Sequence, residues 1–203
     1  MYKKFFKRII DIIISIMALL LLWPVFLIIA ILIKIEDNGP VFFKQVRTGQ
    51  YGNNFKMLKF RTMSIAKKKV KGIEKNQKVT KIGKILRNTS LDELPQFINV
   101  LKGDMSFIGP RPWIVEYFER FTEEQKRRLN VKPGITGLAQ SKGRNGLTIF
   151  QKIQYDLEYV DNISFILDLK IIIESIKIVL KTEYAEINQE DINKELKQLE
   201  LQK

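Results

Sequence analysis

An uninterrupted apolar segment near the N-terminus limits what this chain can fold into. Residues 12–33 carry no charged side chain, and as a helix these 22 residues would be about 33 Å long, enough to cross the hydrocarbon core of a bilayer. The segment is longer than the apolar core of a signal peptide, ends in charged residues and lacks a small-residue cleavage pattern. We therefore interpret it as a membrane segment rather than a cleaved signal peptide.

Pro24 interrupts the middle of this segment, where it removes a backbone hydrogen bond and favours a kink. Basic residues flank both ends, so the positive-inside rule gives a straight span no preferred orientation. They are Lys3, Lys4, Lys7 and Arg8 on one side and Lys34, Lys44 and Arg47 on the other. A broken helix that enters and leaves by the cytoplasmic face satisfies both flanks, and we expect such a re-entrant helix. A kinked helix that crosses the membrane once is the alternative that this pattern leaves open.

The absence of two residue types narrows the possible chemistry. The chain has 203 residues without one cysteine or histidine, which excludes disulfides, thiolate zinc sites, cysteine nucleophiles and histidine-containing triads. Catalysis would have to use carboxylates, Lys, Arg, Tyr or a metal bound through oxygen. The net charge of +13 calls for an anionic partner, which could be nucleic acid, a phosphate-bearing substrate or acidic lipid headgroups.

Short apolar and aromatic pieces after the membrane segment predict a β-hairpin over residues 41–63, with a polar turn at 49–54. Lys59 and Arg61 stand two apart at its end and would share one face. They are either phosphate ligands or solvated charges. Residues 65–78 are polar and lysine-rich, which is typical of a surface loop and also suits contact with anionic lipid.

Helical patterns dominate the remaining sequence. Thr80 is placed to cap a short amphipathic helix that ends at Arg87. Thr122 and Gln125 match a capping box at the start of a basic helix that ends at Leu129. Further helices are expected at 113–118, 150–159 and 163–180.

The expected fold is therefore α+β, in three parts. Residues 1–37 form the re-entrant membrane helix and its flanks. Residues 38–181 form a small, mostly helical catalytic domain with a short β-hairpin and interfacial amphipathic helices. The polar tail 182–203 fits either a frayed helix or a partner contact.

Two adjacent carboxylates, Asp92 and Glu93, stand at an expected helix start. Ser90 and Glu93 match a capping box, so both acids could simply stabilise the helix N-terminus. The same position would keep a carboxylate ionised and nucleophilic, and Asp92 could then attack phosphorus while Glu93 helps to hold a divalent cation or orients an acceptor. Pro95 lacks the N–H of a regular helical turn, so we expect a distorted helix start.

Two further arginines stand at turns. Arg111 lies between Pro110 and Pro112, which restrict the backbone and suit a rigid guanidinium clamp for phosphate. Arg144 lies in a glycine-containing turn. The sequence has no Walker A motif and no GxGxxG motif, so nucleotide binding of the common kinds is unsupported.

These motifs, in this order, resemble the bacterial sugar transferase family, the monotopic phosphoglycosyl transferases, and in particular its minimal PglC-type members. Most of the resemblance lies in the run Ser90–Pro112. Shorter matches are Lys59–Met63, Lys132–Gly137, Gly143–Asn145 and Leu167–Lys170, and with the apolar helix the resemblance covers residues 1–181. Trp23 departs from the family, which often has serine before the proline of the helix.

The resemblance implies transfer of a sugar 1-phosphate from a UDP-sugar to undecaprenyl phosphate with release of UMP, the first membrane step of glycan assembly. Asp92 would carry the sugar phosphate covalently, with Glu93 as its partner and Mg²⁺ held by both carboxylates. The substrate-binding residues implied are Lys59, Arg61, Arg87, Arg111 and Arg144. Anionic lipids and a second copy of the chain are further expected partners, nucleic acid is not, and the expected location is the cytoplasmic face of the bacterial plasma membrane.

A second class of protein explains part of the same sequence. In a membrane-anchored basic protein that binds lipid or nucleic acid without catalysis, Asp92 and Glu93 would merely cap a helix. This alternative accounts for the charge and the anchor but not for the ordered motifs. The sequence leaves open which UDP-sugar is used and whether Glu93 serves the metal or the acceptor.

Overall fold

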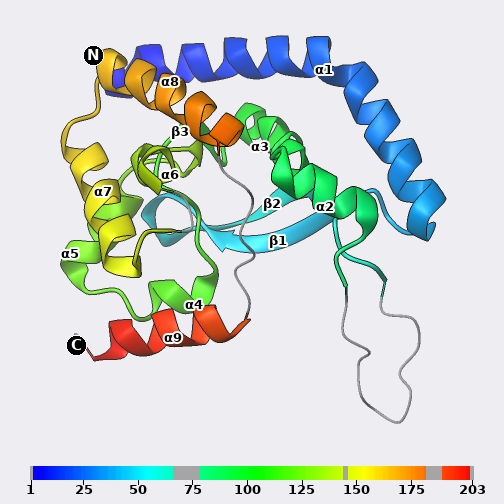
Figure 1. The fold of residues 1–203 in the computed structure, drawn as a ribbon. Coiled ribbons are helices and arrows are strands. Elements are labelled where there is room, and N and C mark those ends of the chain that lie inside the picture. Colours follow the sequence, from blue (N-terminus) through cyan, green and yellow to red (C-terminus); the bar gives the residue numbers. More distant parts are fainter. Residues whose placement is uncertain (1, 66–77, 144–145, 182–188, 202–203) are drawn as a thin grey trace.

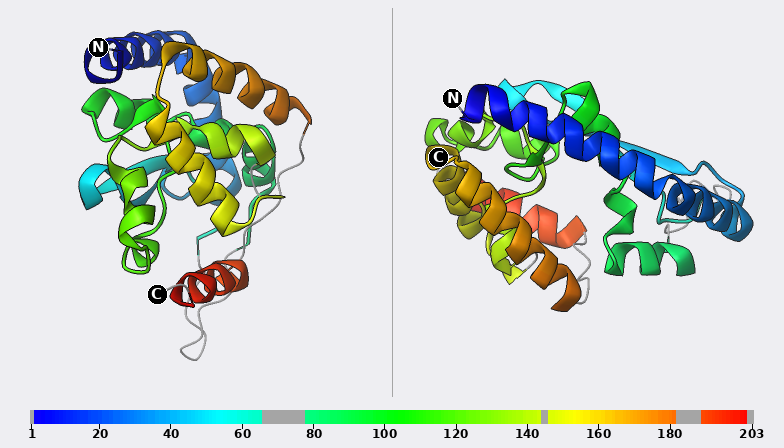
Figure 2. Two further views of the ribbon diagram at one scale, coloured as in Figure 1. Left: turned by 90° about the vertical axis from the view of Figure 1, so that its left-hand side faces the viewer. Right: turned by 90° about the horizontal axis from the view of Figure 1, so that it is seen from above.

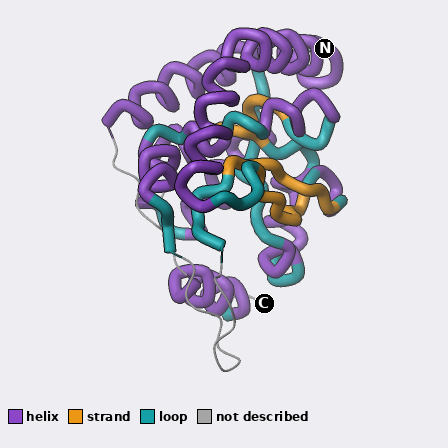
Figure 3. The backbone as a smooth tube through the Cα atoms, turned by 90° about the vertical axis from the view of Figure 1, so that its right-hand side faces the viewer, coloured by secondary structure: helices purple, strands orange, loops and turns teal. Residues whose placement is uncertain are grey.

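The computed structural model describes residues 2–65, 78–143, 146–181 and 189–201. A long N-terminal helix lies along one side of a body of shorter helices, which also contains an antiparallel hairpin and a parallel pair of short strands (Figure 1). The strands lie among helical segments (Figure 3). The expected α+β fold is confirmed.

The long helix α1 covers Lys7–Asp37 and follows a π-helical turn at Tyr2–Phe6. Among the described residues it is the one helix long and apolar enough to cross a membrane. Pro24 lies inside α1, and the helix changes direction along its length (Figure 1), as expected for a proline that removes an internal hydrogen bond. Large apolar side chains along its middle are exposed, among them Leu20, Leu21, Trp23, Leu27 and Ile28.

Strands β1 (Phe42–Thr48) and β2 (Asn54–Phe60) form the predicted antiparallel hairpin, joined through a short 3-10 turn at Gln50–Gly52. Phe43 pairs with Lys59, Gln45 with Met57 and Arg47 with Phe55. Because side chains alternate along a strand, all six belong to the same face of the hairpin. The lysine-rich segment that follows lies almost wholly outside the described residues.

The remaining elements are short, apart from α7 and α8. Strand β3 (Ser106–Ile108) pairs in parallel with β4 (Gly134–Thr136), and 3-10 turns cover Leu91–Glu93 and Arg127–Leu129. The other helices are α2 (Lys81–Asn88), α3 (Gln96–Lys102), α4 (Val115–Phe118), α5 (Glu123–Lys126), α6 (Leu138–Gly143), α7 (Ile149–Asp161), α8 (Phe165–Lys181) and α9 (Gln189–Glu200).

Two of the predicted helix caps are present. The Thr80 side chain accepts a hydrogen bond from the Gly83 N–H at the start of α2, and Thr122 and Gln125 form the predicted capping box. The basic helix expected to end at Leu129 is shorter than predicted, because α5 ends at Lys126 and a 3-10 turn follows.

Helix α9, from the polar tail, packs on the domain. Leu199 is fully buried in a cluster that contains Trp113 of the loop before α4, Tyr117 of α4 and Ile153 of α7. Glu195 accepts hydrogen bonds from the Tyr117 hydroxyl at 2.6 Å and from the Lys152 amine at 2.8 Å. The described part of the tail therefore contains a helix, one of the two expected alternatives, but its packing against the domain was not predicted.

Both ends of α1 contact the same folded body. Near its N-terminus, Arg8 donates to the carbonyl of Val100 at 2.6 Å, and Lys7 lies 2.7 Å from Asp168. Near its C-terminus, Asp37 pairs with Arg61 at 2.6 Å, and Ile29 and Ile33 pack against Phe60 and Leu86. Figure 2 shows α1 running beside the domain in two further views.

Candidate active site

The two adjacent carboxylates lie in the 3-10 turn Leu91–Glu93, between α2 and α3. Ser90 has φ +58°, in the left-handed region, and makes no side-chain cap on this turn, so the capping-box interpretation of Ser90 and Glu93 is wrong. Helix α3 begins only at Gln96, with Pro95 in the N-cap position. The predicted distortion of the helix start is confirmed, because Pro95 cannot donate the hydrogen bond of a continuous helix.

Helix α3 ties this turn to the hairpin. The Asn99 side chain, which is buried, accepts from the Leu58 N–H and donates to the Lys56 carbonyl, each at 2.9 Å. These bonds hold strand β2 so that Lys59 reaches the carboxylates. The Lys59 amine lies 2.6 Å from Glu93 Oε1 and 3.5 Å from Asp92 Oδ2.

Arg111 approaches the same carboxylate from the other side. Its Nη2 lies 3.1 Å from Glu93 Oε1, while the side chain remains 46% exposed. A side-chain hydrogen bond restrains the backbone of Arg111, because the Arg128 guanidinium donates to the Arg111 carbonyl at 2.8 Å. Arg128 also pairs with Asp156 at 3.0 Å, and both side chains are only 1% exposed. The guanidinium of Arg128 lies 4.4 Å from the ring centre of Trp113.

The pKa values of the two carboxylates move in opposite directions. Burial raises the pKa of Asp92, and the negative charge of Glu93 adds to that effect, against the opposing charge of Lys59. Burial also acts to raise the pKa of Glu93, but the charges of Lys59 and Arg111 outweigh it and hold this pKa well below its usual range. The two cations thus favour the charged form of Glu93, and Asp92 is the more basic carboxylate.

The structure brings some of the predicted site residues together and separates others. Lys59 and Arg111 meet Asp92 and Glu93, as described above. Arg61 lies just beyond β2 and contacts Asp37 and the Pro40 carbonyl instead. Arg87 donates to Thr62 Oγ1 at 2.9 Å. Arg144 lies outside the described residues, and Pro24 is in α1, as described above.

Reasoning from the sequence missed three residues that support the site. Arg47 was noted only as a flank of the membrane segment, yet it lies on the same hairpin face as Lys59 and approaches Pro112. Arg128 and Asp156 form a buried ion pair beneath Arg111. Side chains alternate between the two faces of a strand, so a known strand register would have placed Lys59 and Arg47 on the same face of the hairpin. Nothing in the sequence signals that Arg128 and Asp156 are buried together.

The donor set of the site fits a metal shared with a phosphate ligand. Within the described part of the chain no group of three His, Cys, Asp or Glu side chains could hold a metal by itself. Mg²⁺ is commonly bound by one or two carboxylates together with substrate phosphates. Asp92 and Glu93 supply oxygens of the required kind, and the metal would compete with Lys59 for them.

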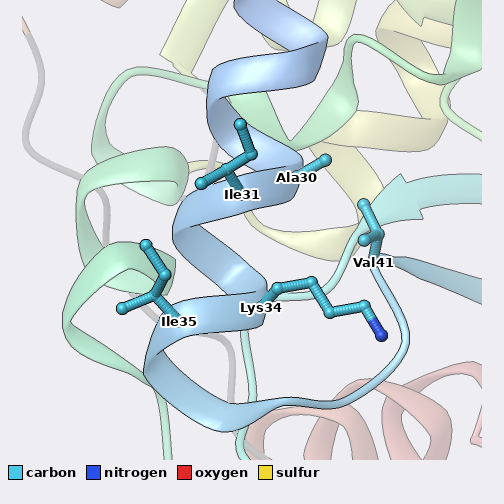
Figure 4. Close-up of a pocket in the computed structure, with 5 residues that line it drawn as sticks. All are labelled: Ala30, Ile31, Lys34, Ile35 and Val41. Atoms are coloured by element: carbon cyan, nitrogen blue, oxygen red, sulfur yellow. The ribbon is translucent and has the colours of Figure 1, made fainter.

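An apolar pocket is found elsewhere, near the C-terminal end of α1. It is lined by Ala30, Ile31, Lys34, Ile35 and Val41, and Figure 4 shows the Lys34 side chain extending along its edge. None of these residues belongs to the carboxylate cluster.

A buried carboxylate, a neighbouring carboxylate that contacts two cations and an arginine between two prolines form a candidate site whose charges suit phosphate chemistry, in a domain that also carries a long apolar helix. Comparison with known proteins identifies the family. The bacterial sugar transferase family model matches residues 2–182, and the chain belongs to that family. It is therefore a sugar transferase.

Individual relatives are similar over most of this chain. The uncharacterized sugar transferase EpsL of Bacillus subtilis (strain 168) is 43% identical over 178 residues, which cover 87% of this chain and 88% of EpsL. A UDP-glucose:undecaprenyl-phosphate glucose-1-phosphate transferase of Klebsiella pneumoniae is 47% identical and covers 82% of this chain. The galactosyl transferase CpsE of Streptococcus agalactiae is 42% identical over 86% of this chain. The match spans only 38% and 42% of the last two relatives.

Proposed function

We propose that this chain transfers a sugar 1-phosphate from a UDP-sugar to undecaprenyl phosphate through a covalent aspartyl intermediate. The observation that carries the proposal is the pair of adjacent carboxylates that both contact Lys59, with Arg111 in contact with the second of them, Glu93. Relatives from Klebsiella pneumoniae and Escherichia coli are named UDP-glucose:undecaprenyl-phosphate glucose-1-phosphate transferases, which supports this substrate class.

In the first step a carboxylate oxygen of Asp92 attacks the phosphorus nearest the sugar. The bond between that phosphorus and the bridging oxygen breaks, and UMP leaves with the bonding electron pair. Asp92 suits this role because its raised pKa makes it the more basic of the two carboxylates. Positive charge from Lys59 and Arg111 stabilises the negative charge that spreads over the phosphoryl oxygens.

In the second step an oxygen of undecaprenyl phosphate attacks the same phosphorus. The bond to Asp92 breaks, the polyprenyl diphosphosugar forms and the carboxylate is restored. Glu93 positions Lys59 and Arg111 in the site before substrate and metal bind, because it contacts both cations. Bound Mg²⁺, held by Asp92 and Glu93 with the phosphates, would supply further positive charge.

The proposed location is the cytoplasmic leaflet of the bacterial plasma membrane, with α1 re-entrant. A straight helix of the length of α1, 31 residues, would be about 46 Å long and would place its ends on opposite sides of a bilayer. Polar contacts from both ends of α1 to one folded body support a helix that returns to the side from which it entered.

The test is a single-turnover experiment without the lipid acceptor. The full chain in detergent is mixed with a panel of UDP-sugars and Mg²⁺, and we expect UMP release together with a mass increase of the intact protein by one sugar phosphate. Asp92→Asn should lose both, because an amide is not a nucleophile for this reaction, while its fold is retained. Removing the metal with EDTA should stop the release of UMP and added Mg²⁺ should restore it.

Two results would exclude the covalent route. An active Asp92→Asn enzyme would do so, and so would sugar phosphate found only on the lipid with no protein-bound stage. Direct attack by undecaprenyl phosphate would then remain.

A further inference from the structure

Arg47 is a partly buried cation in the described structure that the mechanism above does not use. It lies in β1, on the hairpin face that also carries Lys59. Its Nη2 donates to Gln45 Oε1 at 2.7 Å, and its Nη1 makes a long contact of 3.5 Å with the Pro112 carbonyl. Its Nε is buried without a hydrogen-bond partner. Within the described ranges Arg47 makes no ion pair.

Such an arrangement is costly in the absence of an anion. A buried guanidinium normally pairs with a carboxylate, because an uncompensated charge loses its hydration without replacement. Here burial lowers the pKa of Arg47 to about 10, and the positive charge of Arg111 acts in the same direction. Glu93 acts on Arg47 in the opposite sense, so Arg47 belongs to the electrostatic surroundings of the carboxylate pair.

The charges of the site are therefore unequal. Lys59, Arg111 and Arg47 supply three positive charges, and Asp92 and Glu93 supply at most two negative charges. Glu116, an exposed acid of α4, also acts on Arg47 but forms no ion pair with it. Lys59 and Arg111 both contact Glu93, which leaves Arg47 as the cation without a carboxylate. Arg47 contacts the backbone of Pro112, next to Arg111, and the charge of Arg111 acts on Arg47.

We propose that Arg47 and Arg111 form a two-arginine phosphate site, in which the guanidinium of Arg47 binds a phosphate oxygen of the substrate. The inference rests on the proposed function for its substrate class, and both the diphosphate of a UDP-sugar and the phosphate of a polyprenyl acceptor supply this chemistry. A doubly charged phosphate would balance the positive charge of the two arginines. Arginine suits the role because its planar fork matches the spacing of phosphate oxygens.

Binding of inorganic pyrophosphate and of UDP tests the site without any turnover. The thermal unfolding midpoint of the full chain in detergent is measured against the concentration of each ligand. Both should raise the midpoint of the wild-type chain. Arg47→Gln should need at least about tenfold more ligand for the same rise, the size expected when one charge-assisted hydrogen bond is lost.

Lys44→Gln is the matched control. Lys44 is exposed on the same strand, and its substitution removes the same positive charge. It should bind both ligands like the wild-type chain. Arg47→Lys serves if Arg47→Gln does not fold, and it should also bind more weakly, because lysine keeps the charge but lacks the planar fork of the guanidinium. Ligand responses of Arg47→Gln or Arg47→Lys equal to wild type, or no response of the wild-type chain itself, would overturn the proposal.

Kinetics then distinguish the two sources of phosphate. A raised KM for the UDP-sugar, with an unchanged KM for undecaprenyl phosphate, would place Arg47 on the donor diphosphate. The reverse pattern would place it on the acceptor. UMP release by the wild-type chain in the absence of any pyrophosphate or UDP response would leave the proposed function standing and remove only this inference.

Discussion

At the scale of single residues, the site depends on the different electrostatic surroundings of two adjacent carboxylates, Asp92 and Glu93. Asp92 is buried, and its carboxylate lies 3.5 Å from the Lys59 amine. The Glu93 carboxylate lies closer to that amine, at 2.6 Å, and also contacts Arg111 at 3.1 Å. The closer cations stabilise the ionised form of Glu93 more than that of Asp92. Adjacent positions in the sequence thus acquire separate roles through their distance from the same charges.

The first prediction concerns the pH dependence that this geometry sets. Asp92 has to be ionised to attack, and its pKa lies above the ordinary value of 3.8, so the acid limb of kcat/KM should lie above that value as well. Lys59 lowers this pKa; removing it by Lys59→Gln should therefore raise the pKa and move the acid limb to higher pH. The measurement is the pH profile of UMP release. Lys44→Gln should leave the limb in place, and an unmoved limb in Lys59→Gln would contradict the assignment of Asp92.

The second prediction concerns the arginine between the two prolines. Arg111→Lys should reduce kcat/KM by roughly a hundredfold, because a flexible point charge cannot replace a planar fork on a restrained backbone. Arg120→Lys is a control of the same type: Arg120 pairs with Glu200 at the surface, 2.7 Å away, and surface pairs contribute little. Steady-state UMP release measures both. Equal losses in the two variants would mean that Arg111 does not act at the site.

At the scale of elements, α2 and α3 flank the turn Leu91–Glu93, which carries the two carboxylates, and position it beside the hairpin. Asn99 fastens α3 to β2, and the first turn of α2 packs directly on Thr62. A Cβ atom built on Gly83 would lie 2.1 Å from the Thr62 carbonyl oxygen. Glycine is needed here because the backbones approach too closely for any side chain.

The third prediction follows from that contact. Gly83→Ala should destabilise the chain by about 1–3 kcal/mol through overpacking, although the same change in an exposed helix usually stabilises by about 1 kcal/mol. Denaturant unfolding in detergent gives the difference. In Gly146→Ala the new Cβ would meet no atom within 4 Å, so its unfolding midpoint should change little. A Gly83→Ala variant as stable as wild type would show that α2 does not approach Thr62 this closely.

At the scale of the whole molecule, α1 is fastened to the domain at both ends while its middle is exposed. Tyr159 and Lys7 both bind Asp168 from α8, at 2.8 and 2.7 Å, next to the N-terminal end of α1. At the other end, Glu36 accepts hydrogen bonds from the Lys81 and Ile82 N–H groups of α2. The two ends of α1 therefore contact the domain, while the apolar middle of the helix is exposed on its outer surface.

The fourth prediction is that both ends of α1 lie on the cytoplasmic side. Because the chain has no cysteine, single cysteines at Lys3 and Asn38 can be probed with an impermeant thiol reagent in intact cells. Neither should react until the cells are opened, and both should react then. Labelling of one position from outside would support a helix that crosses the membrane once.

Local sequence patterns determined much of this protein. The apolar segment, the proline inside it, the hairpin and the Thr80 and Thr122 caps all depend on residues close together in the chain, and each is present. The Asp92–Glu93 pair and Arg111 between its two prolines were found in the same way, because each is recognised from residues that are adjacent in the sequence.

The tertiary structure alone decided which charges meet. It directs Arg61 to Asp37, brings Arg47 beside Pro112, buries Arg128 with Asp156 and docks α9 through Leu199. These outcomes depend on strand register and on packing between segments that are distant in sequence, and the free energy of a charge changes sharply with burial and with the distance to its partner. A periodic pattern records which side of an element is apolar, but the identity of the neighbour on that side is set when the elements pack.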